Sequence, residues 1–198
     1  MDDRAQDGDE AAIVGARVTL LLAPVSLLEA IADAQAAAPE GAEPAAVEWV
    51  GVGVLAPDLV ESAPAGRRMR QVAEEPSTRP WLVRIVVVDD PASPTGRRIV
   101  GHLGGHGAPN DEGMVEIGYT LSAPDRGQGF ATEAARAWFA WAYERGGTVA
   151  RICTLPTNAP SLAIAHRLGL VEVGREWDED DEVWEVVLEA PLPLAPPD

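Results

Sequence analysis

The sequence predicts one α/β domain of the α+β kind, with a mixed, mostly antiparallel sheet of about six to seven strands flanked by helices. The length of 198 residues and the hydrophobic content of 46% are enough for one domain with a substantial core. Strand-like apolar runs alternate with segments of helical periodicity, and we see no internal repeat. We place the domain at 13–190, between an acidic start at 1–12, expected to be disordered, and a proline-rich tail at 191–198.

The part of the chain before Trp81 shows few clear elements. A strand is expected at 17–23, and Pro24 then favours a helix start, because its fixed φ suits the first helical position. Apolar residues follow it at helical spacing as far as Ile31. The other expectations are a loop at 36–46, an apolar stretch at 47–55 broken by two glycines, and a short helix at 67–75.

From Trp81 onward the strand and helix patterns are sustained. Apolar residues recur on one helical face from 128 to 142, and a pair of glycines ends that segment. A second helix is expected at 158–168, ended by Gly169. Strands are expected at 81–88, 98–104, 114–121, 149–155, 170–177 and 183–189.

The charge excludes several classes of function. The chain has 32 acidic residues against 15 basic ones, a formal net charge of −17, and every basic residue is Arg. Such a chain suits neither nucleic acid nor an anionic membrane, so neither is expected as a partner. Without Lys, Walker-A ATPases, Schiff-base enzymes and ordinary kinases are excluded. The charge favours a cationic or amine partner weakly, because a GC-rich genome or a salt-adapted proteome explains it more simply.

The expected location is the cytoplasm. Cys153 is the only cysteine, so no disulfide within the chain is expected. The N-terminus is acidic and is not followed by the apolar segment of a signal peptide. The most apolar early stretch, 18–31, contains Pro24 and Glu29 and is too short to cross a bilayer.

The segment that carries chemistry is a strand, a glycine-containing loop and a helix start. The first N–H groups of a helix lack intrahelical partners and lie at the positive end of its dipole, so this arrangement favours an anion. Gly127 and Gly129 would let the backbone approach a phosphate, and Arg126 would add charge. Three interpretations are open: a dinucleotide-binding turn, which lacks its third glycine because Thr132 stands there, a turn without ligand, and a coenzyme A site.

The third interpretation is supported by a resemblance to a known family. Arg126, Gly129 and Ala131 fit the signature of the GNAT acetyltransferases, which is Arg or Gln, two residues, Gly, one residue, then Gly or Ala. Residues 158–161, Asn-Ala-Pro-Ser, and 168–170, Leu-Gly-Leu, resemble the family's Asn-x-x-Ser and Leu-Gly-Phe segment. Together with Glu-Ile-Gly-Tyr and Gly-x-Ala-Thr-Glu-Ala, the combination is similar to the RimJ/RimL-like branch, whose members acetylate protein N-termini and small amines.

The resemblance, which spans residues 83–187, implies acetyl-CoA as co-substrate, no metal, and a central strand that splays from its neighbour at the cofactor site. The backbone of Tyr119, Thr120 and Leu121 would pair with the pantetheine arm, and one of their N–H groups would hold the thioester oxygen as it becomes an oxyanion. The side chain of Asn158 would bind the same arm. The residues implied to hold the pyrophosphate or lie beside it are Arg126, Gly127, Gln128, Gly129, Phe130, Ala131 and Thr132.

Acetyl transfer to an amine needs a base for the amine proton and an acid for the leaving thiolate. Glu116, on the central strand, is the candidate base, acting through a water; the simpler alternative is a strand residue paired with an Arg. Many family members carry a Tyr acid seven residues after the Asn, but Ala165 stands there. Ser161, implied to lie near the sulfur, therefore becomes the candidate acid. Positioning alone would also serve, because a thiolate is a tolerable leaving group.

Three other groupings carry weaker signals. The five acids of Asp178–Glu182 join the last two strands and would attract a cationic amine if they border the acceptor site; a solvated hairpin tip is the simpler interpretation. His102 and His106 are four residues apart, a spacing that does not bring two side chains together on a strand or loop. A metal site is therefore not expected there, and the alternative is that they line the acceptor pocket. Cys153 is expected in the core rather than as a nucleophile.

The sequence therefore favours an N-acetyltransferase that moves the acetyl group of acetyl-CoA directly to a primary amine. A small cationic amine is the preferred acceptor, a protein N-terminus is the other, and a homodimer is left open. The alternative is a GNAT-fold sensor that binds acyl-CoA without turnover, which the missing Tyr leaves open. A purely structural α/β domain is the third hypothesis.

Overall fold

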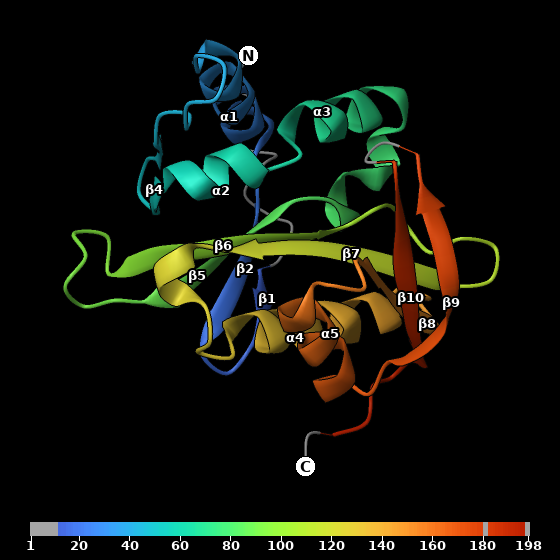
Figure 1. Cartoon of the computed structure of the whole chain (residues 1–198). Helices are drawn as coiled ribbons and strands as arrows, with labels where there is room; N and C mark the ends of the chain where they lie inside the picture. The colour runs from blue at the N-terminus through green and yellow to red at the C-terminus, as the bar shows by residue number, and fades with distance from the viewer. Residues whose placement is uncertain (1–11, 180–181, 197–198) are drawn as a thin grey trace.

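A computed structural model of the protein describes residues 12–179 and 182–196, in which one large sheet carries helices on both faces (Figure 1). The strands are β1 (Ile13–Val14), β2 (Val18–Leu22), β3 (Val47–Trp49), β4 (Gly53–Leu55), β5 (Arg84–Asp89), β6 (Arg97–Gly105), β7 (Met114–Leu121), β8 (Val149–Thr154), β9 (Val171–Asp178) and β10 (Val183–Pro191). The α-helices are α1 (Val25–Ala37), α2 (Pro57–Ser62), α3 (Ala65–Glu74), α4 (Phe130–Tyr143) and α5 (Ala159–Arg167). Two short 3-10 segments are η2 (Pro76–Trp81) and η3 (Ala123–Asp125).

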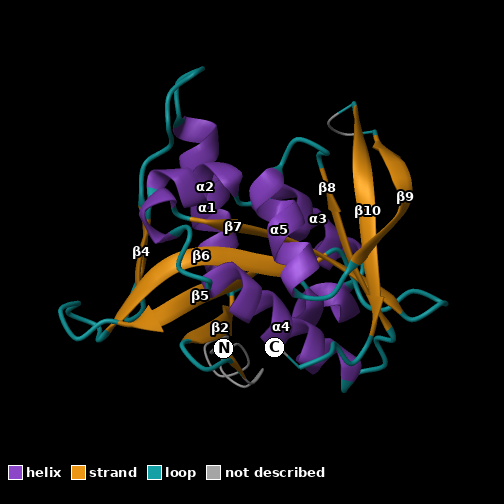
Figure 2. Cartoon of the chain, turned by 60° about the horizontal axis from the view of Figure 1, so that its bottom comes forward, coloured by secondary structure: helices purple, strands orange, loops and turns teal. Residues whose placement is uncertain are grey.

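The main sheet confirms the predicted mixed, mostly antiparallel architecture. Its order is β1-β2-β5-β6-β7-β8-β10-β9, with β3 and β4 forming a separate ribbon. The sheet has eight strands rather than six to seven, because the two-residue β1 pairs with β2. Helices α1, α2 and α3 lie over one face, and α4 and α5 cover the other (Figures 1 and 2).

The centre of the sheet is splayed between β7 and β8. These two strands pair in parallel over three positions, from Met114 opposite Val149 to Glu116 opposite Arg151. Beyond Glu116, β7 runs on to Leu121 paired only with β6, while β8 continues against β10. Among the described residues, one edge of β7 therefore has no strand partner from Ile117 to Leu121, and backbone groups along that edge can pair with an extended ligand.

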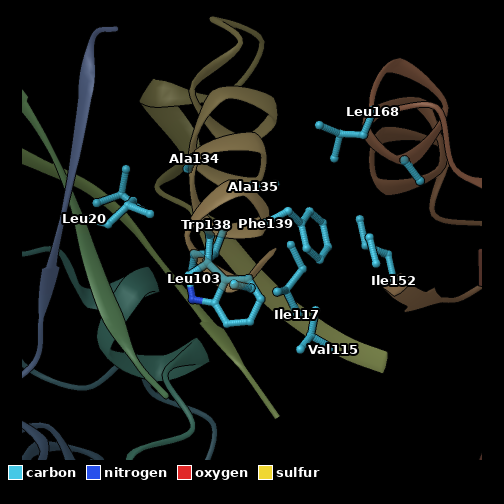
Figure 3. Packing of buried hydrophobic residues seen from close by; sticks show 14 of the residues in the cluster. Leu20, Leu103, Val115, Ile117, Ala134, Ala135, Trp138, Phe139, Ile152 and Leu168 are labelled. Carbon is cyan, nitrogen blue, oxygen red and sulfur yellow. The ribbon is translucent and has the colours of Figure 1, made fainter. Parts of the chain in front are cut away.

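The core consists of two clusters, one on each face of the sheet. Alternate residues of β5 enter different clusters, with Val86 on the α4 face and Ile85 on the α1 face, because successive side chains of a strand point to opposite faces. On the α4 face, Trp138 and Phe139 are fully buried and lie near Ile117 of β7 (Figure 3). These contacts fix α4 against the strand that carries the splay.

Before β5 the structure differs from the sequence prediction at Trp81 and in the segment of α2, among other positions. The strand expected at 81–88 begins only at Arg84, because Trp81 lies in η2 and packs edge to face against Trp141 with ring centroids 4.8 Å apart. The helix α2 was not predicted. Its Asp58 carboxylate accepts hydrogen bonds from the Ser122 hydroxyl and the Ala123 N–H, at 3.2 and 2.9 Å, and thereby holds the loop that follows β7.

The ends of the domain also differ slightly from expectation. Pro191, assigned to the tail, is the last residue of β10, and Leu192 is 9% exposed and donates its N–H to the carbonyl of Thr148. Pro24 is the cap before α1 rather than its first residue. The start predicted to be disordered lies outside the described residues, apart from position 12. No helix in the described part of the chain is long and apolar enough to span a membrane.

Candidate functional site

The loop between β7 and α4 has the backbone of an anion-binding turn. Gly127 and Gly129 have φ values of 77° and 85°, in the left-handed region that glycine tolerates. No side chain caps the N-terminus of α4. The N–H groups of Phe130, Ala131 and Thr132 consequently have no acceptor among the described residues, as the anion-site interpretation requires.

The polar side chains of this loop hold its shape. Arg126 donates from Nε to the Leu121 carbonyl, with 2.9 Å between the atoms, and the Gln128 amide reaches the Pro124 carbonyl at 3.3 Å. Arg126 is exposed, and its terminal nitrogens make no hydrogen bond or ion pair within the described residues. It can therefore fold the loop and still offer charge to a phosphate. Phe130 differs from Arg126, because its ring is buried and only its backbone N–H can contact a phosphate.

Arg17 is a second cation at this loop, and sequence reasoning missed it. Its Nη1 donates to the Gln128 carbonyl at 3.2 Å, and its Nε is 2.9 Å from Glu133 Oε2. Burial opposes ionisation of Glu133, but hydrogen bonds from the backbone and side chain of Arg17 and from the Val18 N–H outweigh it and hold the pKa of Glu133 below its usual range. Arg17 and Glu133 are 116 residues apart, so no local spacing signals this pair.

A pair of hydroxyl groups joins β7 to α5. Asn158 caps α5 by accepting the Ser161 N–H at its Oδ1, 3.2 Å away. The Ser161 hydroxyl then lies 2.9 Å from the Tyr119 hydroxyl. Burial raises the pKa of Tyr119 and the hydrogen bond with Ser161 only partly offsets this, so the phenol is protonated at neutral pH. Ala165, at the position of the family's Tyr acid, is fully buried and offers no hydroxyl.

Glu116 contacts a histidine rather than an arginine. Its Oε1 lies 3.2 Å from Nδ1 of His106, whose backbone N–H also donates to the Glu116 carbonyl. Burial alone would raise the pKa of Glu116, but the hydrogen bond and charge of His106 and the charge of Arg151 hold it below its usual range. Glu116 is therefore ionised at neutral pH. An ionised carboxylate on Nδ1 favours the tautomer with the proton there, which leaves Nε2 as an acceptor.

A pocket of about 170 Å³ lies beside this pair. Residues of β6 and β7 line one side, and residues from the end of α2 to the start of α3 line the other. Its lining comprises Ser62, Pro64, Arg67, Arg68, Val83, His102, Leu103, Gly104, Gly105, His106, Gly118, Tyr119 and Thr120. Both histidines thus line one pocket.

His102 and His106 nevertheless have different surroundings. His102 is buried, its Nε2 lies 3.1 Å from the Ser62 hydroxyl, and burial lowers its pKa to about 4, so it is neutral at physiological pH. His106 is exposed and lies beside Glu116. No group of three metal-ligating side chains is found among the described residues. Both histidines line this pocket, and its use by the acceptor stays a prediction.

Cys153 is partly buried rather than a core residue, and its thiol hydrogen-bonds with the Glu116 side chain. Burial and the charge of Glu116 raise the pKa of the Cys153 thiol, so little thiolate is present for nucleophilic attack. Within the acidic run 178–182, residues 180–181 lie outside the described part, and the expected role of the run stays a prediction. Beside it, Trp177 and Trp184 form an exposed edge-to-face pair with centroids 5.7 Å apart.

The chain was compared with known proteins at the level of sequence and of structure. It matches the model of the acetyltransferase (GNAT) domain over residues 20–171, and the search of curated proteins gives no match. The ribosomal-protein-S5-alanine acetyltransferase from Vibrio fischeri has a TM-score of 0.59 at 13% identity, over 94% of this chain and 100% of that chain.

Two further solved structures, determined as complexes, share the fold. One is RimL, a ribosomal L7/L12 α-N-protein acetyltransferase in complex with coenzyme A, with a TM-score of 0.58 at 17% identity over 91% of this chain and 98% of that chain. The other is the microcin C7 self-immunity acetyltransferase MccE in complex with acetyl-CoA and AMP, with a TM-score of 0.58 at 16% identity over 89% and 93%. These three structures show that the chain shares their fold, and the RimJ/RimL-like branch stays a prediction from the motifs. Because the domain model covers more than three quarters of the sequence, the chain belongs to the GNAT acetyltransferase family.

Proposed function

We propose that this acetyltransferase moves the acetyl group of acetyl-CoA directly to a primary amine, with both substrates bound together. The observation that carries the proposal is the divergence of β7 and β8 after Glu116, which leaves a free strand edge between the glycine loop of α4 and the capped start of α5. One edge of backbone and two helix N-termini suit a long ligand with an extended arm and phosphates at one end.

The residues present fit coenzyme A. Backbone N–H groups from Gly127 to Thr132 would hold the pyrophosphate, and a Cβ added to Gly127 would meet open space, so the backbone there is accessible. Arg126 and Arg17 would supply positive charge beside it. The free edge of β7 at 119–121 would pair with the pantetheine arm. The amide nitrogen of Asn158, whose oxygen caps α5, is the group left for that arm.

The chain's own side chains provide a proton acceptor and a proton donor. Acetyl-CoA supplies the acetyl group as a thioester, which a neutral amine attacks. Nε2 of His106 would accept the amine proton, while Glu116, predicted as the base, would act as a positioning residue through Nδ1. The Ser161 hydroxyl, linked to that of Tyr119, would donate a proton to the departing sulfur. The C–N bond forms as the C–S bond breaks, leaving an amide and a thiol.

A small amine is the acceptor that we favour. The pocket of about 170 Å³ beside His106 has room for a small amine. The neighbours named for acetylating ribosomal proteins keep a protein N-terminus as the other candidate. A cationic amine remains the expectation from net charge alone, and the cytoplasmic location, the homodimer and the domain limits stay predictions.

A non-catalytic acyl-CoA sensor is the second candidate. Ala165 favours it, because the family's usual acid is replaced by a buried residue that cannot transfer a proton. The sensor predicts acetyl-CoA binding with no acetylated amine, and the Tyr119–Ser161 pair argues against it by supplying hydroxyl groups nearby.

Binding and turnover together test the proposal. Acetyl-CoA at one hundred times its Kd should stabilise the protein by about 2.7 kcal/mol. Thiol release should then depend on an added amine and fall on the order of a hundredfold in His106→Asn, with His166→Asn, an exposed histidine outside the site, as control. Stabilisation without amine-dependent thiol release would support the sensor, and no stabilisation at millimolar acetyl-CoA would contradict both functions.

A further inference from the structure

Arg68 is a buried cation whose local partners are neutral. It is 6% exposed, and its Nη1 donates to the Gln71 side-chain oxygen at 2.8 Å and to the His106 carbonyl at 3.5 Å. It forms no ion pair with any described carboxylate. Burial, reinforced by the charge of Arg67, lowers the pKa of Arg68 to about 10, against an opposing effect of Glu116. Arg68 thus remains charged at neutral pH without a counter-ion in contact.

The remaining donors of Arg68 reach the pocket. Its Nε and Nη2 make no hydrogen bond in the described structure. They are also absent from the set of fully buried polar atoms without a partner, so both nitrogens are partly accessible. Arg68 also lines the pocket of about 170 Å³. The Nε–Nη2 edge of a guanidinium presents two parallel N–H groups, which match the two oxygens of a carboxylate.

The rest of the lining adds no negative charge. Arg67 and Arg68 are its charged members with fixed sign, and it contains neither Asp nor Glu. Glu116 lies close enough to influence Arg68, but its carboxylate is already bound to His106. The net charge of −17 describes the whole chain and does not give the sign of the charge that lines this pocket.

We propose that the acceptor amine carries a carboxylate, which Arg68 binds through Nε and Nη2 at the end of the pocket, so that the substrate is a small amino acid rather than a polyamine. This inference rests on the proposed acetyl transfer. It places the carboxylate on Arg68 and the amine on the side of His106 and Tyr119, which line the same pocket. Removing the Arg68 charge from water costs free energy, and a bound carboxylate would offset that cost.

Matched acceptors test the proposal on the full chain. The panel comprises L-amino acids and β-alanine, the corresponding carboxamides, putrescine and spermidine, and two peptides that differ by Glu or Gln at the second position. We expect kcat/KM at least tenfold higher for a carboxylate than for its carboxamide. Arg68→Gln should reduce that ratio below threefold and leave the KM of acetyl-CoA unchanged, Arg68→Lys should keep part of it, and Arg70→Gln, exposed on the same helix, should keep all of it.

Three results of this acceptor panel would contradict the carboxylate site. Preference for putrescine or spermidine, equal use of carboxylates and carboxamides, or an equal loss for all acceptors in Arg68→Gln would overturn the proposal. Efficient transfer confined to the Glu peptide would overturn its small-molecule part.

A binding measurement keeps the inference separate from the proposed function. If no amine is acetylated, acetyl transfer fails, and calorimetry with N-acetyl-β-alanine against its carboxamide on the coenzyme A complex decides the carboxylate site. We expect binding of the carboxylate alone, weakened at least tenfold in Arg68→Gln and unchanged in Arg70→Gln. Absence of binding, or binding that Arg68→Gln leaves unchanged, would contradict the site.

Discussion

At the scale of single residues, the proton donor depends on a contact between distant parts of the chain. Tyr119 and Ser161 are 42 positions apart, and their hydroxyl groups lie 2.9 Å from each other because β7 and the start of α5 meet beside the splay. The sequence motif indicates Ser161 but says nothing of the Tyr119 side chain, which was expected to serve only through its backbone. In the proposed mechanism this hydroxyl pair takes the role of the family's Tyr acid, at whose position Ala165 stands.

Tyr119→Phe tests this replacement. We expect kcat to fall by on the order of tenfold to a hundredfold, since a positioned acid contributes this much or more and a thiolate leaves moderately well without one. Ser161→Ala should have a similar effect, and the double variant should lose less than the product of the two, because both act through one hydrogen bond. Tyr143→Phe, on the exposed end of α4, is the control. A fully multiplicative double variant would contradict a shared path.

At the scale of elements, the glycine loop and α4 form one unit. Gly127→Ala introduces a side chain where φ is 77° and where the added Cβ meets open space. We expect a stability loss of about 1–2 kcal/mol from the left-handed conformation. The KM of acetyl-CoA should rise at least tenfold, while kcat at saturation changes little. Gly146→Ala has the same strain, with φ of 96° and open space, in the turn after α4. An equal rise of KM in both variants would contradict a phosphate loop.

The ion pair of Arg17, just before β2, with Glu133 of α4 makes a contribution to folding stability that depends on pH. Glu133 has a depressed pKa in the folded protein, so its contribution to stability is present above its unfolded pKa and is lost as pH falls through the folded value. Glu133→Gln removes hydrogen bonds to a charged group and should cost about 1.5–3 kcal/mol at pH 7. Chemical denaturation at pH 7 and pH 3 should show this difference shrinking at pH 3. A difference that stays constant or grows on acidification would contradict the ion pair.

At the scale of the whole molecule, local patterns predicted most elements after Trp81, but they did not predict α2 or the contacts between distant elements. The apolar face of α4, with Trp138 and Phe139, and the glycines of the phosphate loop follow from periodicity and backbone preference within a few residues. The pairs Arg17–Glu133 and His106–Glu116 follow from strand order, which neighbouring residues do not encode. The 3-10 segment at Trp81 was missed for the same reason, since an aromatic core contact and a strand demand equally apolar residues.

The fold also brings arginines from distant parts of the sequence to the α4 loop and to the pocket. An overall −17 opposes a polyanionic cofactor, yet Arg17 and Arg126 gather at the α4 loop and Arg68 faces the pocket. Charges within a screening length of about 8 Å weigh more than distant ones, and at the α4 loop Glu133 offsets Arg17, whereas Arg126 has no ion pair among the described residues. Net charge therefore bears on solubility and on nucleic acid, while the sign preferred by each site follows from the side chains that line it.

The central claim is direct acetyl transfer to an amine, and mass spectrometry of the amine product tests it most directly. Acetyl-CoA labelled with carbon-13 in the acetyl group is incubated with the protein and the acceptor panel, and thiol and product are quantified together. The account predicts one labelled N-acetyl group on the amine for each thiol released, with no label left on the protein. Thiol release that yields labelled acetate without acetylated amine, or label retained on the chain, would contradict it.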